Sequence, residues 1–341
     1  KPSDKPLSVE EARILLEACQ RFRWKHTKFG DYLAGWLALS RVAGALPIRP
    51  HIWLTGGSGT GKSTALDRLI RPALGAEASR IYVQGGTTEA GIRQLIKADS
   101  LPVLFDEFET TGPATMARVS SIVELLRQSW SHTSGSIVKG GADGTASIYQ
   151  LAFAALVSSI RVNLPNDADR SRFTVLELVP HDADLAHWDA LDAILALITP
   201  DYGERLFARS IKMMPVILEN FRTFKRVLAP KMGQRFADQH GMLLAGFGIL
   251  AADTPISDDE AEEFSHGLSL DDDRAEHTTD EHDCLQAILT SRIAVPASSG
   301  SISVSIADAL KGRVEDGKAG QVESWTQAVR AYGLLIDNQF L

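Results

Sequence analysis

The stretch HIWLTGGSGTGKST, residues 51–64, decides the fold of this chain. It begins with a mostly apolar run that is typical of a buried strand. The segment that follows has the spacing G-x-x-x-x-G-K-S, and a helical pattern begins at Lys62. A strand, a glycine-rich turn and a helix in this order predict a phosphate-binding loop. The predicted loop residues are Gly56, Gly57, Ser58, Gly59, Thr60, Gly61, Lys62, Ser63 and Thr64.

The residue types of this loop indicate its chemistry. Glycines let backbone N–H groups surround a phosphate chain, and the helix N-terminus adds partial positive charge. Lys62 is expected to reach the β- and γ-phosphates, and the Ser63 hydroxyl is expected to ligate Mg²⁺. The sequence therefore predicts a site for a nucleoside triphosphate, taken as ATP, together with Mg²⁺.

A second motif, LPVLFDEFE at residues 101–109, ends an apolar strand with two carboxylates. In P-loop enzymes the first carboxylate helps to hold Mg²⁺, and the next one activates the attacking water. Asp106 is therefore the predicted metal ligand, and Glu107 is the predicted general base. A residue that activates water indicates hydrolysis. This disfavours one alternative function, a P-loop kinase for a small metabolite, because a kinase does not need an activated water.

Short apolar runs alternate with helical stretches over residues 51–180, which predicts an α/β fold with a central parallel sheet. The expected strands are HIWLT (51–55), RIYVQ (80–84), PVLFD (102–106), AFAALVSS (152–159) and FTVLEL (173–178). Helical segments are expected on both sides of this core, over residues 1–50 and 181–252. A capping box at Ser8 and Glu11 marks the start of the first helix.

The segment SGSIVKGGADGTASIYQ, residues 134–150, predicts a β-hairpin with Lys139 beside its turn. A single lysine at a turn is normally solvated. The functional alternative is that Lys139 contacts the phosphate backbone of a single DNA strand that is threaded past the hairpin.

Polar side chains near the last two strands complete the candidate site. Ser158 and Ser159 end the fourth strand, where a group that senses the γ-phosphate is expected. Arg170 and Arg172 precede the fifth strand, and either could be an arginine finger that stabilises transition-state charge. An ordinary ion pair with Asp167 or Asp169 is the alternative for both.

Residues 253–283 contain thirteen Asp or Glu and one Arg, whereas the whole chain has a net charge of −8. The remainder is therefore slightly basic, so a nucleic-acid partner is not excluded. We expect this acidic stretch to be solvated and mobile, the alternative being a regulatory or partner-binding tail. Residues 284–341 are expected to form a small module, compatible with a winged helix and with other small folds.

The bulk properties favour a cytoplasmic protein. The apolar runs are too short to cross a bilayer, so no membrane span is expected. Cys19 and Cys284 cannot form a disulfide framework. The chain begins at Lys1 without an initiator Met or a signal pattern, so we expect an excised fragment of a longer product.

Taken in order, GGSGTGKST, LFDEFE, the Lys139 hairpin, LVSSI and DRSRFTVLEL resemble the motifs of superfamily 3 and related AAA+ replicative helicases. More closely, RPHIWLTGGSGTGKST, TTEAGIRQ, LPVLFDEFE and ADRSRFTVLEL resemble the helicase part of phage and prophage primase-helicases. This likeness runs from about Leu33 to Pro180. One departure is Ser159, because superfamily 3 proteins usually carry Asn as the sensor there.

The resemblance implies an AAA+ like core in a hexameric ring, with ATP bound between subunits. It implies that Lys139 grips DNA, that Arg172 is the finger with Arg170 second, and that a primase or polymerase domain lies upstream. The predicted function is an ATP-dependent motor that translocates on single-stranded or forked DNA. The alternative is a non-translocating AAA+ replication initiator or a regulatory ATPase switch.

Overall fold

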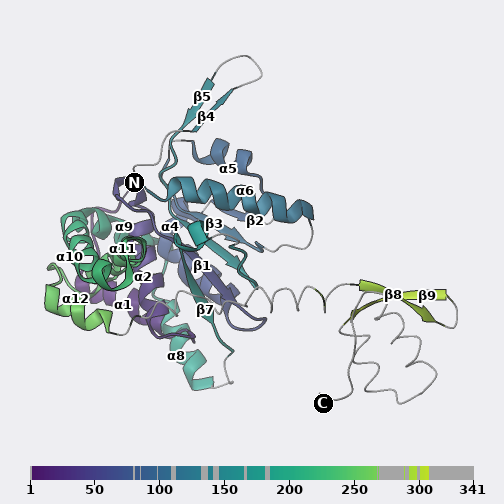
Figure 1. Cartoon of the computed structure of the whole chain (residues 1–341). Helices are drawn as coiled ribbons and strands as arrows, with labels where there is room; N and C mark the ends of the chain where they lie inside the picture. The colour runs from purple at the N-terminus through teal and green to yellow at the C-terminus, as the bar shows by residue number, and fades with distance from the viewer. Residues whose placement is uncertain are drawn as a thin grey trace. The chain divides into compact units, whose positions relative to one another are not determined.

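The computed structural model divides the chain into two compact units, Lys1–Asp273 and Arg274–Leu341 (Figure 1). None of the described helices combines the length and apolarity that a membrane span requires. The structure describes residues 2–79, 81–84, 86–97, 99–108, 113–131, 137–140, 146–164, 167–180, 185–266, 268, 288, 292–297 and 300–306.

A five-stranded parallel sheet forms the centre of the first unit, in the order β2-β3-β6-β1-β7. All five predicted strands are present, which confirms the α/β fold class. Every residue of β1, which pairs with β6 and β7, is buried, as expected for a strand with neighbours on both sides and layers on both faces. The strands are β1 (His51–Gly56), β2 (Tyr82–Gln84), β3 (Val103–Asp106), β6 (Ala155–Ser159) and β7 (Phe173–Leu178).

Helices surround this sheet, and several begin where the sequence indicates. Ser8 and Glu11 form the predicted capping box, and Thr88 caps the helix that follows it. The helices are α1 (Val9–Gln20), α2 (Lys28–Ser40), η1 (Ala43–Ala45), α3 (Lys62–Thr64), η2 (Ala65–Ile70), α4 (Arg71–Ala78), α5 (Glu89–Ile96), α6 (Pro113–Ser129), α7 (Asp167–Arg170), α8 (Leu185–Leu195), α9 (Pro200–Lys212), α10 (Met214–Met232), α11 (Gln234–Ala251) and α12 (Asp258–Ser265).

The two faces of the sheet are packed differently. On one face, Ile52, Leu54 and Leu156 belong to a core that also contains residues of α1, α2, α9 and α11. On the other face, Trp53 lies 5.7 Å from Phe108 and 5.8 Å from Phe173, measured between ring centroids. The helices before and after the sheet therefore share one hydrophobic core with it.

His51 joins β1 to two neighbouring elements. Its Nδ1 accepts a hydrogen bond from the Ala155 backbone N–H, so the neutral ring donates from Nε2 to the Leu126 carbonyl, 2.8 Å away. Burial lowers the pKa of His51 to about 4, opposed by the bond to Leu126. The ring is consequently neutral at physiological pH and holds α6 against the sheet.

Gln239 of α11 connects the helical region to the sheet. Its side-chain amide donates to the His51 carbonyl at 2.8 Å and to the Thr174 hydroxyl at 3.2 Å. Its oxygen accepts from the indole N–H of Trp130 at 2.7 Å. All of these groups are buried, so each would otherwise be left without a partner in the protein interior.

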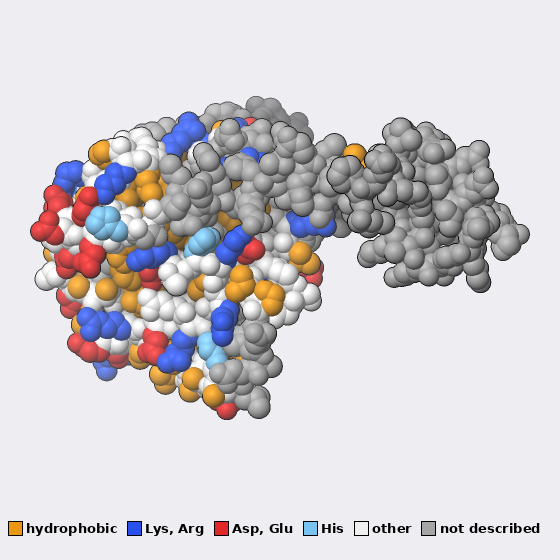
Figure 2. Space-filling model, turned by 60° about the horizontal axis from the view of Figure 1, so that its bottom comes forward, with side chains coloured by type: hydrophobic (Ala, Val, Ile, Leu, Met, Phe, Trp, Pro, Cys, Tyr) orange, Lys and Arg blue, Asp and Glu red, His pale blue; other side chains and the backbone are white. Residues whose placement is uncertain are grey.

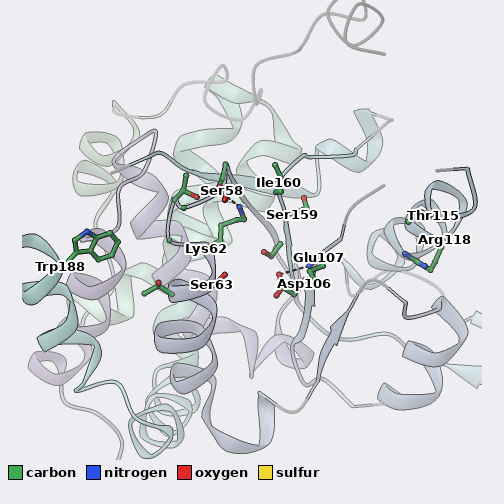
Figure 3. Close-up of a pocket in the computed structure, with 16 residues that line it drawn as sticks. Ser58, Lys62, Ser63, Asp106, Glu107, Thr115, Arg118, Ser159, Ile160 and Trp188 are labelled. Carbon is green, nitrogen blue, oxygen red and sulfur yellow. Dashed lines mark hydrogen bonds between the residues drawn. The ribbon is translucent and has the colours of Figure 1, made fainter. Parts of the chain in front are cut away.

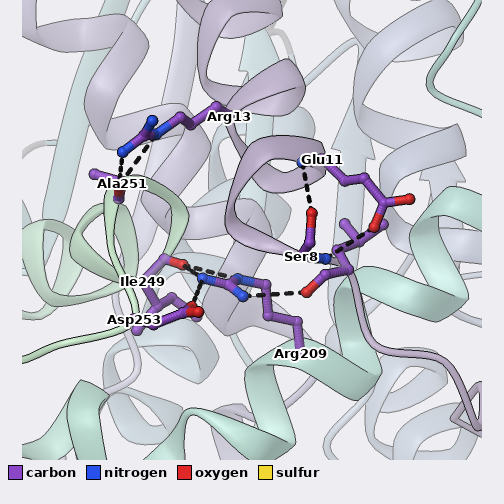
Figure 4. Close-up of polar contacts among 8 residues, drawn as sticks. Ser8, Glu11, Arg13, Arg209, Ile249, Ala251 and Asp253 are labelled. Atoms are coloured by element: carbon purple, nitrogen blue, oxygen red, sulfur yellow. Dashed lines mark hydrogen bonds and ion pairs between the residues drawn. The ribbon is translucent and has the colours of Figure 1, made fainter.

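Arg209 of α9 is nearly fully buried and fastens three segments together (Figure 4). Its guanidinium donates to the carbonyls of Ile249 and Leu7 and lies 2.5 Å from an Asp253 oxygen. Arg13 of α1 donates to the Ala251 carbonyl at the same end of α11. The N-terminal segment, α9 and the end of α11 are thereby linked.

A two-stranded antiparallel ribbon, β4 (Ile137–Gly140) and β5 (Ala146–Tyr149), lies between α6 and β6 and projects away from the sheet in Figure 1. This is the predicted hairpin. Its second strand ends beside α5, where the Arg93 guanidinium lies 5.2 Å from the Tyr149 ring centroid. Because β6 begins only a few residues later, the hairpin emerges at the amino-terminal edge of the sheet.

The acidic stretch 253–283 is not solvated throughout, contrary to the prediction. Its first part forms α12, which begins with a capping box of Ser257 and Glu260 and buries Ala261. Lys231 of α10 pairs with Glu262 at 2.5 Å. The prediction was based on the average composition of this stretch. It did not take into account the capping box of Ser257 and Glu260 or the buried Ala261, which stabilise the helix.

The second unit contains, among its described residues, an antiparallel hairpin of β8 (Arg292–Ala297) and β9 (Gly300–Ser305). The remainder of the predicted module at 284–341 lies outside the described residues, apart from Ile288 and Ile306. The winged-helix interpretation therefore stays a prediction.

Replacing Arg209 with Met should lower the free energy of unfolding by about 3 kcal/mol, because carbonyls of Ile249 and Leu7 would lose buried donors. Urea unfolding of the intact chain measures this. Arg222→Met is the matched control, since Arg222 is exposed and pairs with Glu219 on its own helix, so a change below about 0.5 kcal/mol is expected. Equal losses in the two variants would contradict a fastening role for Arg209.

Candidate nucleotide site

The glycine-rich loop turns sharply between β1 and α3. Gly56 lies so close to β7 that a Cβ atom there would be 2.6 Å from the Leu178 carbonyl oxygen, which excludes any larger residue. Thr60 closes the loop by donating to the Gly57 carbonyl at 2.9 Å. The Lys62 ammonium donates to the carbonyls of Gly56 and Gly57, so it lies across the mouth of the loop.

A cavity of about 790 Å³ opens above this loop at the carboxyl edge of the sheet (Figure 3). It brings together most of the residues that the sequence predicted for the site, from elements far apart in the chain. The lining residues are Gly57, Ser58, Gly59, Thr60, Gly61, Lys62, Ser63, Thr64, Asp106, Glu107, Thr115, Arg118, Ser158, Ser159, Ile160 and Trp188.

Asp106 is held in place by two hydrogen bonds. The Tyr82 hydroxyl donates to one carboxylate oxygen, and the Glu107 backbone N–H donates to the other at 3.0 Å. Burial, together with the bond to Asp106, raises the pKa of Tyr82 above its ordinary value, so the phenol stays protonated and keeps donating. Tyr82 was not predicted as a site residue, because its link to Asp106 joins neighbouring strands that are separated in the sequence.

Glu107 has an unusual backbone conformation, with φ at 53° in the left-handed region. Such a value is uncommon for a residue with a side chain, and it indicates that surrounding structure imposes it. The next residue, Phe108, is buried, and its ring centroid lies 5.5 Å from that of Phe105. The Phe108 backbone N–H donates to the Ser158 carbonyl at 3.1 Å. Anchors on both sides thus present the exposed Glu107 carboxylate to the cavity (Figure 3).

The oxygen donors in the cavity suit Mg²⁺. The exposed Ser63 hydroxyl and the Asp106 carboxylate are hard oxygen ligands, and a carboxylate that accepts two hydrogen bonds retains further lone pairs. Among the described residues, no cluster of three His, Cys, Asp or Glu side chains forms a separate metal site. Mg²⁺ commonly binds with few protein ligands plus phosphate oxygens and waters, and this arrangement fits that pattern.

Ser159 does line the cavity, but its hydroxyl is engaged elsewhere. It donates to the Arg161 carbonyl at 2.6 Å and accepts from the Trp53 indole N–H at 2.7 Å. Its proton is therefore not directed at a phosphate. Ser158 lies one residue beyond the register pair Phe105–Val157, which places it opposite Asp106 across β3 and β6. Within the described part of the chain, the Ser158 hydroxyl makes no hydrogen bond in this structure.

Besides Ile160, which follows β6, three cavity residues on helices were not predicted from the sequence. Thr115 and Arg118 come from α6, and Trp188 comes from α8. Each lies in a helix that carries no recognisable motif. Arg118 places a permanent positive charge on the Glu107 side of the cavity, as Figure 3 shows.

Arg170 and Arg172 lie apart from this cavity. Arg172 directly precedes β7, whose first residue pairs with His51, so both arginines are at the amino-terminal edge of the sheet. The five residue steps of β1 separate that edge from the loop by roughly 16 Å. Neither arginine can therefore reach a phosphate bound in the loop of its own chain.

The two arginines differ in their surroundings. Arg172 is partly buried, donates to the Ala168 carbonyl and lies 5.4 Å from the Trp130 ring centroid. Burial, with Arg235 and Arg127 nearby, lowers its pKa. Arg170 is exposed, and its Nε donates to the Leu164 carbonyl at 2.8 Å.

Lys139 lies in β4, in register with Ser147, but its side chain is outside the described part of the structure. The face in Figure 2 carries Lys and Arg side chains interspersed with Asp and Glu side chains across its described surface. The described part of that face therefore shows no extended surface of positive charge alone.

No family model matches this sequence, and no curated protein matches it. Among solved structures, the chain is similar to a candidate ATPase from Cytophaga hutchinsonii, with 12% identity, a TM-score of 0.38 and 94% of each chain covered. It is also similar to inhibitor-bound JCV helicase, with 12% identity, a TM-score of 0.34, and 73% of this chain and 67% of that chain covered. TM-scores this low leave its activity undetermined.

Replacing Tyr82 with Phe should raise the Mg²⁺ concentration needed for half-maximal ATP turnover by about tenfold, because Asp106 would lose the bond that orients it. Steady-state turnover measured against Mg²⁺ concentration tests this. Tyr149→Phe is the control, since that ring lies beside α5 outside the cavity lining. An unchanged Mg²⁺ dependence in Tyr82→Phe would show that Asp106 needs no such support.

Proposed function

We propose that this chain hydrolyses ATP, with Mg²⁺, in the cavity above the glycine-rich loop. The observation that carries the proposal is the convergence of Lys62 and Ser63 of α3 with Asp106 and Glu107 at the end of β3 on one cavity. A phosphate-binding loop alone fits many nucleotide-binding proteins. The exposed carboxylate of Glu107, beside the proposed metal ligand Asp106, adds the group that hydrolysis requires.

The residues divide the work as follows. Backbone N–H groups of the loop and the Lys62 ammonium hold the β- and γ-phosphates. Ser63 and Asp106 would hold Mg²⁺, which when bound neutralises charge on the phosphate oxygens. Glu107 accepts a proton from the attacking water as the water oxygen bonds to the γ-phosphorus, while the bond from that phosphorus to the β–γ bridging oxygen breaks and ADP leaves. We assign the hydroxyl that senses the γ-phosphate to Ser158 in place of Ser159, because the Ser159 hydroxyl donates its hydrogen bond to the Arg161 carbonyl.

The arginine finger is proposed to act between subunits of a ring. This proposal is supported by the position of Arg170 and Arg172 at the edge of the sheet opposite the loop, where they cannot serve their own site. Arg170 is the better candidate because it is exposed, whereas Arg172 is partly buried. This reverses the order that the sequence resemblance implied.

Glu107→Gln should bind ATP as tightly as the wild type but lose at least a hundredfold of its turnover, since an amide accepts no proton from water. Arg170→Ala should also lose turnover. When the two variants are co-expressed, about a quarter of the interfaces in a head-to-tail ring join an intact Glu107 to an intact Arg170. Partial recovery of turnover in that mixture is the expected result.

Lys62→Ala is the control for these measurements, because it should lose ATP binding as well as turnover. A mixture that stays inactive would show that Arg170 does not complete the site of a neighbouring subunit. Solution mass measured on the same samples establishes whether rings form at all.

Coupling of hydrolysis to movement along single-stranded or forked DNA is the second part of the proposal. The β4–β5 hairpin precedes the start of β6, and Ser158, near the other end of that strand, lines the cavity. One short strand therefore connects the phosphate site to the hairpin that carries Lys139. A displacement at one end of β6 can be transmitted to the other end as a rigid shift.

Lys139→Ala should retain basal ATP turnover and lose unwinding of forked DNA, because only the grip on the phosphate backbone is removed. Strand displacement and turnover are measured on the same preparation. Lys225→Ala, on α10 and paired with Asp238, is the control for loss of a surface lysine. Turnover without unwinding by the wild type would instead favour a non-translocating switch.

A further inference from the structure

The cavity has two chemically different ends. Glu107 and Arg118 lie at one end, beyond the glycine-rich loop, whereas Trp188 lies at the opposite end (Figure 3). The first end carries charged groups suited to phosphate chemistry. The second presents a large aromatic side chain, which has no evident use for a triphosphate tail.

The position of Trp188 is fixed by the helix that carries it. Leu191 and Leu195, three and seven residues further on α8, are buried in the hydrophobic core. Asp192 pairs with Arg68 of η2 at 2.5 Å, which ties α8 to the helix that follows the loop. Residues at this spacing share one face of a helix, so Trp188 lies on the same face of α8 as the buried Leu191 and Leu195.

Trp188 reaches the loop itself. A Cβ atom placed on Gly61 would lie 4.0 Å from the indole Cη2 and 4.0 Å from two ring carbons of Phe22. The indole is thus one van der Waals layer from the start of α3, and it is only partly buried. A flat ligand group next to this loop would meet an aromatic surface.

We propose that the base of the bound nucleotide stacks against Trp188, a deduction that rests on the proposed ATP site. Stacking on an aromatic ring provides affinity for any base, because every base has a π-face. The same contact sets the polarity of the nucleotide. With the base at Trp188, the triphosphate runs across the loop and brings its terminal phosphate to Glu107 and Arg118.

The test compares ATP with inorganic tripolyphosphate, which has the phosphates but no base, by titration calorimetry on the intact chain. Trp188→Leu should weaken ATP binding by about tenfold and leave tripolyphosphate binding unchanged. Trp188→Phe should retain most of the ATP affinity, because it keeps an aromatic face. Asp189→Ala, an exposed change on the same helix, should bind both ligands as the wild type does.

The outcomes distinguish the two proposals. If Lys62→Ala and the wild type bind ATP equally, the nucleotide site itself is wrong, and the stacking proposal fails with it. If ATP binding depends on Lys62 but Trp188→Leu binds it normally, only the stacking proposal is overturned. Equal weakening of ATP and tripolyphosphate in Trp188→Leu would show that Trp188 merely supports the loop, which also overturns it.

Discussion

The parallel pairing of β1 with β6 and β7 is the constraint on which the rest of this structure depends. Parallel strands end at a common edge, so the loop after Gly56, the carboxylate of Asp106 and the hydroxyl of Ser158 meet without any direct link in the sequence. The close approach of Gly56 to the Leu178 carbonyl sets how near the loop lies to β7. The position of the cavity follows from backbone geometry before any side chain contributes.

The same pairing separates functions that a single site would otherwise combine. Groups suited to holding and cleaving a triphosphate gather at the carboxyl edge, whereas Arg170, Arg172 and the β4–β5 hairpin lie toward the amino edge. Electrostatic stabilisation requires contact at a few ångströms, so groups at opposite edges cannot cooperate within one chain. A neighbouring copy is the simplest way to unite them, and this makes assembly a part of the proposed chemistry.

Much of this arrangement could be predicted from the sequence, because the informative signals are local. The strand, loop and helix at residues 51–64 and the apolar strand before Asp106 are contiguous patterns, and the structure confirms them. The choice between Ser158 and Ser159 could not be made, since a strand buried on both faces shows no alternation. Tyr82, Arg118 and Trp188 depend on contacts between distant segments, which no spacing rule reveals.

The buried amide of Gln239 has a consequence for the limits of the folding unit. It forms hydrogen bonds with Trp130, His51 and Thr174, which lie in or next to the sheet. Gln239 itself belongs to α11, which follows the last strand of the sheet in the sequence. A polypeptide ending near Pro180 would contain the glycine-rich loop, Asp106 and Glu107. It would expose the apolar face of the sheet that α9 and α11 cover, and three buried polar groups would lose Gln239 as their hydrogen-bond partner. The smallest autonomous folding unit that contains the cavity therefore extends through α11, and the helical region is an integral part of the sheet's support.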